Sequence, residues 1–267
     1  MKYFLPLFII IACSCKKGID PRSLALSIQS EKLENQNEII NLNEEAIQID
    51  PKNYRAYNNL AIAQLKTKKD TSEVIFNLNR ALQLAPKYDI AFYNLVNVYH
   101  EFKDYSNVIT KGEEYLLNST NTHIVALVGE AYNYQEQWSK AAKYLEKAVK
   151  LDSTRAGTLK ELGKAQMFLG NLDIALSNLD KAIELDPNYH QAYNRRAIVY
   201  SEIGDYEKAL KDYNKSISIH QSGTYFYNRG ILFAEKIQNM EKACKDLQSA
   251  NDLSHKLSLG YYEMHCK

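Results

Sequence analysis

The chain has 267 residues, of which 45% are hydrophobic, so it is long enough to bury a core of ordinary size. Its 33 Lys and Arg balance 32 Asp and Glu, which excludes the basic excess that a nucleic-acid partner requires. Only 10 Gly and 5 Pro argue against a turn-rich β fold, and the abundance of Ala, Leu, Glu and Lys predicts an all-α fold.

The first fifteen residues form a segment of their own. A positive start at Lys2 precedes an apolar run that is shorter than the ~20 residues needed to span a bilayer, so residues 1–12 are predicted to be a signal peptide. The sequence Ile10-Ile11-Ala12-Cys13 resembles the lipobox of bacterial lipoproteins. The resemblance implies a lipid anchor (palmitate) at Cys13, with Cys15 as the alternative acceptor. An ordinary secretion signal with incidental cysteines is the competing interpretation.

This N-terminus predicts a location in the bacterial cell envelope. The lipid would hold the chain on a membrane, most plausibly the outer membrane, where it faces the periplasm or the surface. Residues 13–36 are then expected to serve as lipid anchor and tether, although residues 23–33 also suit a degenerate helix.

A period of about 34 residues organises the rest of the chain. Ala or a substitute for it recurs at one position, and Pro follows five residues later in three of the seven periods, as in Ala46 and Pro51. A second small position, preceded by a large apolar residue four places earlier, allows two helices to approach closely. The recurring positions are Ala46, Ala81, Tyr115, Ala148, Ala182, Ser216 and Ala250, and the second set is Ala61, Gly129, Gly163, Ala197 and Gly230. The pattern predicts helical hairpins.

These hairpins resemble tetratricopeptide (TPR) repeats, most clearly in the motifs at residues 192–197, 204–210 and 162–187. The resemblance implies an all-α, right-handed superhelical α-solenoid. We expect its residues, 37–267, to comprise a half repeat at 37–52, six repeats over about 53–253, and a capping helix at 257–266. The turn near residues 237–239 is one residue longer than usual, so a local distortion is expected there.

A disulfide between Cys244 and Cys266 is predicted at the C-terminal end. The midpoint of the two cysteines is residue 255, inside the turn that joins the last two helices, so both lie at the same height in an antiparallel pair. An extracytoplasmic location permits oxidation. Two buried thiols are the alternative.

The inner face of the stack is the expected binding site, because the family lines a groove with the first helix of each hairpin. Asn suits recognition of a peptide backbone, and Tyr adds apolar area with little loss of entropy. The competing interpretation is that Asn is simply common on such a face. The candidate groove residues are Asn58, Asn59, Tyr93, Asn94, Asn97, Lys160, Lys164, Asn194, Arg195, Tyr227 and Asn228, with Glu161 beside them.

No catalytic motif is present in the sequence, and the six His are scattered without the spacing of metal ligands. We therefore expect no enzyme activity, no cofactor and no metal. The predicted function is a membrane-anchored scaffold or adaptor that binds a partner protein or peptide segment during cell-envelope assembly. The alternatives are a solute- or glycan-binding lipoprotein and an accessory subunit of an envelope enzyme.

Overall fold

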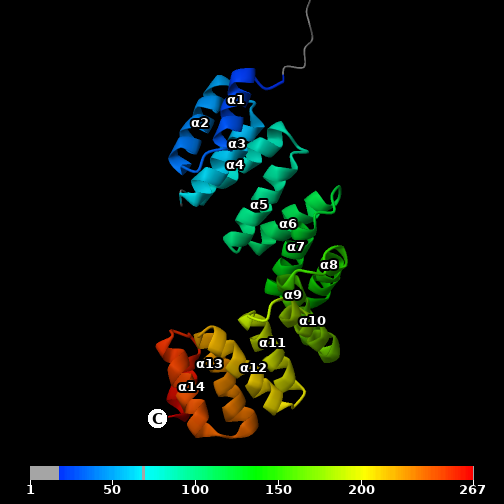
Figure 1. Cartoon of the computed structure of the whole chain (residues 1–267), viewed down its shortest axis with the longest axis vertical. Coiled ribbons are helices and arrows are strands. Elements are labelled where there is room, and N and C mark those ends of the chain that lie inside the picture. The colour runs from blue at the N-terminus through cyan, green and yellow to red at the C-terminus, as the bar shows by residue number, and fades with distance from the viewer. Residues whose placement is uncertain (1–17, 68–69, 267) are drawn as a thin grey trace, which may run out of the picture. The chain divides into compact units, whose positions relative to one another are not determined.

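A computed structural model describes residues 18–67 and 70–266, and within these ranges every regular element is a helix (Figure 1). No helix in this part of the chain is long and apolar enough to cross a membrane. The elements are α1 (Pro21–Ser30), α2 (Gln36–Ile49), α3 (Tyr54–Lys66), α4 (Thr71–Leu84), α5 (Asp89–Glu101), α6 (Tyr105–Leu116), α7 (Thr122–Tyr134), α8 (Trp138–Leu151), α9 (Ala156–Phe168), α10 (Leu172–Leu185), α11 (His190–Glu202), α12 (Tyr206–Ile219), α13 (Gly223–Ile231), the π-helical η1 (Leu232–Ile237), α14 (Met240–Asp252) and α15 (Ser258–His265).

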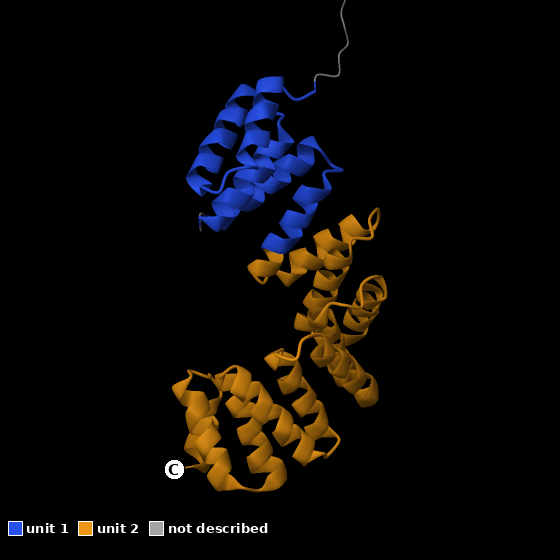
Figure 2. Ribbon diagram, in the orientation of Figure 1, with its two compact units in different colours: residues 1–98 blue, residues 99–267 orange. Residues whose placement is uncertain are grey.

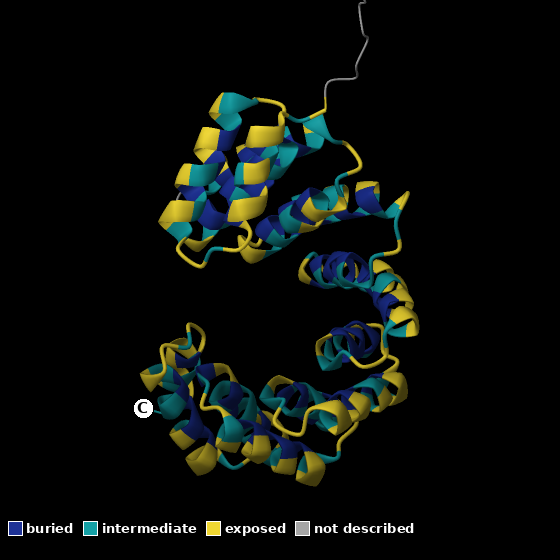
Figure 3. Cartoon of the chain, turned by 45° about the horizontal axis from the view of Figure 1, so that its top comes forward, coloured by how far each residue is buried: buried dark blue, intermediate teal, exposed yellow. Residues whose placement is uncertain are grey.

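The chain divides into two compact units, residues 1–98 and residues 99–267 (Figure 2). In unit 1, α1 packs on α2, α2 on α3 and α3 on α4; in unit 2, each helix from α6 to α15 packs on the next. Buried residues gather on the helix faces that meet, and exposed residues cover the opposite faces (Figure 3). The all-α fold of successive hairpins is confirmed.

The repeating small residues form the core, as the period predicts. The side chains at Ala46, Ala81, Ala148, Ala182 and Ala250 are fully buried. The two departures from Ala, Tyr115 and Ser216, are buried as well. These positions therefore keep their packing role even where the residue type changes.

Two glycines show why this packing needs small residues. A Cβ atom at Gly129 would lie 2.7 Å from Leu145 Cγ, and one at Gly163 would lie 2.8 Å from Leu179 Cγ. In both repeats the first helix thus rests directly on a Leu of the second, which leaves no room for a larger side chain.

Residues 21–30 form helix α1, which packs on α2 and α3, so the second half of residues 13–36 follows the alternative of a degenerate helix at residues 23–33 rather than that of a tether. Asp20 caps the helix by accepting from two backbone N–H groups, and Pro21 occupies its first turn. Its buried stripe consists of Ser23, Ser27 and Ser30 rather than apolar residues. A search for hydrophobic periodicity passes over such a helix, since close contact is made here by small polar side chains.

The sixth repeat absorbs its extra residue in η1. The chain leaves α13 in a π-helical turn, and Gln238 then takes a left-handed conformation with φ 58° before α14 begins. A π-turn accommodates one inserted residue without ending the helix. The expected distortion near residues 237–239 is therefore present.

The closing helix α15 lies within the predicted range and packs on α14. Cys244 on α14 and Cys266 at the end of α15 are joined by a disulfide, with their Cα atoms 5.6 Å apart. This is the pairing that the sequence predicts.

Candidate functional site

In unit 1, the candidate groove residues form a hydrogen-bonded network. Asn94 Nδ2 donates to Asn58 Oδ1 at 2.8 Å, and Asn58 Nδ2 donates to Asn59 Oδ1 at 3.2 Å. Asn59 Nδ2 in turn donates to the carbonyl of Ser27 at 3.1 Å. These three Asn line a cavity of about 290 Å³. Asn58 is buried and bonded to its neighbours, so it joins successive repeats, and its predicted contact with a partner stays a prediction.

Two other candidates in unit 1 are more accessible. Tyr93 is 37% exposed. Asn97 is half-buried and donates to the carbonyl of Tyr93 at 2.7 Å, one turn earlier on α5.

The same asparagine pairing recurs in unit 2. Asn228 Nδ2 on α13 donates to Asn194 Oδ1 on α11 at 3.1 Å, and Asn194 is buried. Asn194 therefore also links successive repeats, and its predicted contact with a partner stays a prediction. Tyr227 stacks on His255, with ring centres 4.5 Å apart, which fixes its ring against the turn before the closing helix.

The charged candidates of unit 2 gather around Glu161. Lys160 Nζ donates to Glu161 Oε1, and Asn133 Nδ2 donates to Glu161 Oε2 at 3.0 Å. Burial disfavours the charge on Lys160, but the adjacent carboxylate holds the pKa of Lys160 above its usual value. Burial likewise opposes ionisation of Glu161, and Lys160 brings the pKa of Glu161 below its usual value. The two form a compensated ion pair.

Lys164 and Arg195 differ from Lys160, because neither has a carboxylate oxygen within ion-pair distance among the described residues. Burial lowers the pKa of Lys164 and also that of Arg195, although Glu161 acts in the opposite direction on both. The mutual repulsion of the two cations lowers the pKa of Lys164 further. These two side chains are partly dehydrated cations from successive first helices.

Aromatic side chains border Lys164. Lys164 Nζ lies 5.0 Å from the ring centre of Tyr134 and 5.7 Å from that of Trp138. Tyr134 is 51% exposed and stacks on Tyr105, with ring centres 4.2 Å apart. Lys164 therefore lies beside the accessible ring of Tyr134.

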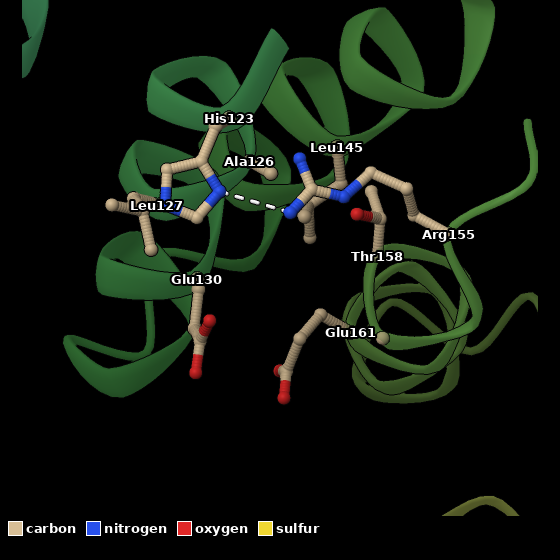
Figure 4. Close-up of a pocket in the computed structure, with 9 residues that line it drawn as sticks. His123, Ala126, Leu127, Glu130, Leu145, Arg155, Thr158 and Glu161 are labelled. Atoms are coloured by element: carbon tan, nitrogen blue, oxygen red, sulfur yellow. Dashed lines mark hydrogen bonds between the residues drawn. The ribbon is translucent and has the colours of Figure 1, made fainter. Parts of the chain in front are cut away.

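A cavity of about 320 Å³ lies between α7, α8 and α9. Its lining residues are His123, Ala126, Leu127, Glu130, Leu145, Arg155, Gly157, Thr158 and Glu161. Figure 4 shows Arg155 extending toward His123, with the side chains of Glu130 and Glu161 approaching from α7 and α9. Arg155 Nη2 lies 2.9 Å from His123 Nδ1, and burial, assisted by Arg155, lowers the pKa of His123.

Glu130 faces a second histidine. His100 Nε2 lies 3.4 Å from Glu130 Oε2, and this carboxylate raises the pKa of His100 although burial opposes it. Arg155 has no carboxylate oxygen within ion-pair distance in the described ranges. Among the described residues, the cavity thus combines a carboxylate whose cationic partner is the imidazole of His100 with a guanidinium that is hydrogen-bonded to the ring of His123.

Sequence reasoning missed three residues of this cavity: His123, Glu130 and Arg155. The register of the repeats contains the missing signal, because Glu130 occupies the position on α7 that Lys164 occupies on α9. Lys164 was recognised at that position and Glu130 was not. No group of three or more His, Cys, Asp or Glu in the described residues is placed to hold a metal ion. Cys13 and Cys15 lie outside the described residues.

Comparison with known families identifies tetratricopeptide repeats in the chain. Models of this repeat match residues 42–73, 161–189 and 178–211. The human protein "Tetratricopeptide repeat protein 6" (Homo sapiens) is 31% identical over 115 residues, which is 40% of this chain and 20% of that protein. The chain therefore matches about a fifth of the length of this curated relative.

Solved structures support the same fold. A tetratricopeptide repeat protein from Parabacteroides merdae has a TM-score of 0.70 at 16% identity, covering 93% of this chain and 100% of its own. YrrB, described as a TPR protein with an unusual peptide-binding site, has a TM-score of 0.59 at 24% identity. The match covers 68% of this chain and 94% of YrrB. PilF of Pseudomonas aeruginosa has a TM-score of 0.63 at 19% identity, and the match covers 80% of this chain and 98% of PilF. Together with the repeats, this fold favours a protein-interaction scaffold.

Proposed function

We propose that the chain is a non-catalytic scaffold of the bacterial cell envelope that binds an extended, acidic segment of a partner protein across Lys164 and Arg195. The observation that carries this proposal is the pair of partly dehydrated cations on α9 and α11 that lack a carboxylate partner among the described residues. A carboxylate supplied by another protein would compensate both charges.

The surroundings of the two cations suit a peptide. Arg195 presents a planar guanidinium that matches a carboxylate at two points, whereas Lys164 presents a single charge. Tyr134 offers an accessible ring next to Lys164, against which an apolar side chain of the partner can pack. An acidic residue followed or preceded by an apolar one is therefore the expected recognition element.

The membrane part of the proposal rests on the N-terminal sequence. The apolar run that ends at Cys13 supports cleavage and lipidation at that residue, which would keep the scaffold at a membrane surface in the envelope. A mature bacterial lipoprotein carries several acyl chains, and this number makes anchoring stable where one chain is marginal.

A peptide selection tests the partner site. A random peptide library displayed on phage is selected against the purified chain and against the double variant Lys164→Gln/Arg195→Gln. The wild-type chain should enrich peptides rich in Asp and Glu, and the double variant should lose that enrichment. The control is Lys147→Gln/Lys181→Gln, which removes the same charge from exposed positions on α8 and α10. Equal loss in both variants, or enrichment without acidic residues, would overturn the proposal.

A further inference from the structure

The cavity between α7, α8 and α9 contains charged groups that the proposed site for an acidic segment, at Lys164 and Arg195, does not use. Its charged groups are of opposite sign and come from separate elements: Arg155 precedes α9, and Glu130 stands on α7. Arg155 is held in place by His123 at 2.9 Å. That bond occupies one nitrogen of the guanidinium, so Nε and Nη1 remain able to donate to a ligand.

The acidic side of the cavity is also held in place. Glu161 is fixed by Lys160 and by Asn133 at 3.0 Å, and its charge is compensated by Lys160. Glu130 has only His100 at 3.4 Å as a cationic partner among the described residues. Glu130 is thus the carboxylate of the cavity best able to accept an ammonium group, while Arg155 is the group best able to donate to a carboxylate.

We infer that this cavity binds a small zwitterion, a free α-amino acid, with its carboxylate at Arg155 and its ammonium group at Glu130. Thr158 lines the same cavity and offers a hydroxyl to the ligand. Ala126, Leu127 and Leu145 provide apolar walls for the side chain of the amino acid. A volume of about 320 Å³ accommodates a ligand of this size.

Gly157 keeps the cavity open. A Cβ atom at this position would meet only Tyr189 Oη, at 3.7 Å, which is an ordinary van der Waals distance. A side chain can therefore be introduced at residue 157 without displacing the backbone, and because Gly157 lines the cavity, a large side chain there is expected to reduce the space for the ligand. This position allows the cavity to be filled without removing any charged group.

Binding is tested with three matched probes and the purified chain, by isothermal titration calorimetry and thermal shift. The twenty free L-amino acids are screened first, and L-leucine is compared with L-leucinamide, which lacks the carboxylate, and N-acetyl-L-leucine, which lacks the ammonium group. We expect saturable binding of at least one free amino acid, and a loss of affinity of about tenfold or more for each derivative of it.

Binding of the amide alone would indicate a site for basic groups of a partner. Binding of the N-acetyl form alone would indicate a simple anion site. Either result, or no binding by any amino acid, overturns the inference.

Two substitutions at residue 157 separate binding from folding. Gly157→Leu should abolish binding, whereas Gly157→Ala should retain it, because a methyl group reaches only an ordinary contact distance. Both variants should keep the unfolding temperature of the unliganded chain or raise it, since each replaces a helical Gly. Retained binding in a folded Gly157→Leu variant would place the ligand elsewhere. Glu130→Gln should weaken L-leucine more than it weakens N-acetyl-L-leucine, and equal weakening would contradict the assigned orientation.

Discussion

Arg229 and Asp246 form a two-point ion pair, in which Arg229 Nε lies 2.7 Å from Asp246 Oδ2 and Nη2 lies 2.8 Å from Oδ1. The preceding repeat has the same pair in Arg196 and Asp212, at 2.7 and 2.9 Å. The partners are 16 residues apart in the fifth repeat and 17 apart in the sixth. The π-helical η1 accommodates the additional residue between them, so the distorted hairpin keeps the same link between its first and second helices.

Asp212→Asn should destabilise unit 2 by about 3 kcal/mol, because it leaves a largely buried guanidinium without its main partner. Burial tends to lower the pKa of Arg196, but the hydrogen bonds that its guanidinium donates to Asp212 and Asp180 hold this pKa above its usual value. Asp180→Asn is the matched control: Asp180 also pairs with Arg196, yet its side chain is 53% exposed, so its loss should cost less than about 1 kcal/mol. Urea unfolding measures both free energies. Similar costs for the two variants would contradict the role of burial.

The asparagine pair in unit 1 should contribute to stability as a coupled unit. Asn94→Ala leaves the buried Oδ1 of Asn58 without the donor that stands 2.8 Å away, which should cost about 1 to 2 kcal/mol. A double-mutant cycle with Asn58→Ala should give a coupling energy of about 1 kcal/mol. If the losses of unfolding free energy in the two single variants simply add up in the double variant, the hydrogen bond contributes nothing to stability in solution.

Two histidines near the cavity should titrate in opposite directions from the usual value of 6.5. Glu130 raises the pKa of His100, although burial opposes it, whereas burial and Arg155 lower the pKa of His123. His100 therefore stabilises the fold below pH 6.5, and this contribution disappears as the pH rises through its folded pKa. His123 behaves inversely: its contribution to the stability of the fold is present above pH 6.5 and is lost as the pH falls through its folded pKa.

Because these contributions oppose each other in the overall stability, the titrations are measured residue by residue, from the ring signals in nuclear magnetic resonance spectra. Glu130→Gln should lower the pKa of His100, and Arg155→Gln should raise that of His123. A midpoint below 6.5 for His100 in the wild-type chain would contradict the pairing with Glu130.

Lipidation at Cys13 is expected to determine where the chain is found. Cys13→Ala should move the protein from the membrane fraction to the soluble fraction and prevent incorporation of labelled palmitate, because the acyl chains supply the anchoring free energy. Cys15→Ala is the matched control and should leave both unchanged. The reverse result would assign the anchor to Cys15, and release by neither variant would exclude this mode of attachment.

The sequence predicted the fold well, because close helix packing leaves a periodic signal. Ala148 and Ala182 in the first recurring set, and Gly129 and Gly163 in the second, are each spaced 34 residues apart, and all four are buried. Helix α1 carries no such signal. It is held through Asn53, whose Nδ2 donates to the carbonyl and the hydroxyl of Ser23 at 3.0 and 2.9 Å, a contact between residues 30 positions apart that periodicity does not reveal.

The candidate site was predicted only in part, because accessibility depends on the partner of each side chain. Asn58 and Lys164 were both predicted from the inner face of a first helix, yet Asn58 is buried against Asn94, whereas Lys164 lies beside the exposed ring of Tyr134. A polar residue on a first helix is thus equally consistent with a link between repeats and with a binding contact. The distinction requires the neighbouring repeat in three dimensions.

The disulfide between Cys244 and Cys266 should stabilise the C-terminal end of unit 2. It closes a span of 22 residues, which in the chain-entropy model corresponds to about 3 kcal/mol. The double variant Cys244→Ser/Cys266→Ser should therefore lose hydrogen-exchange protection in α14 and α15, while the amides of α7, far from the disulfide in the order of helices, keep theirs. Mass spectrometry of the unreduced chain should find these two cysteines linked and two hydrogens fewer than in the reduced chain.

Oxidation is favoured outside the cytoplasm, so the bond between Cys244 and Cys266 should form when the chain is exported and be absent when it is retained in the cytoplasm. Two free thiols in the exported chain, or unchanged protection of α15 in the double variant, would show that packing alone closes the stack.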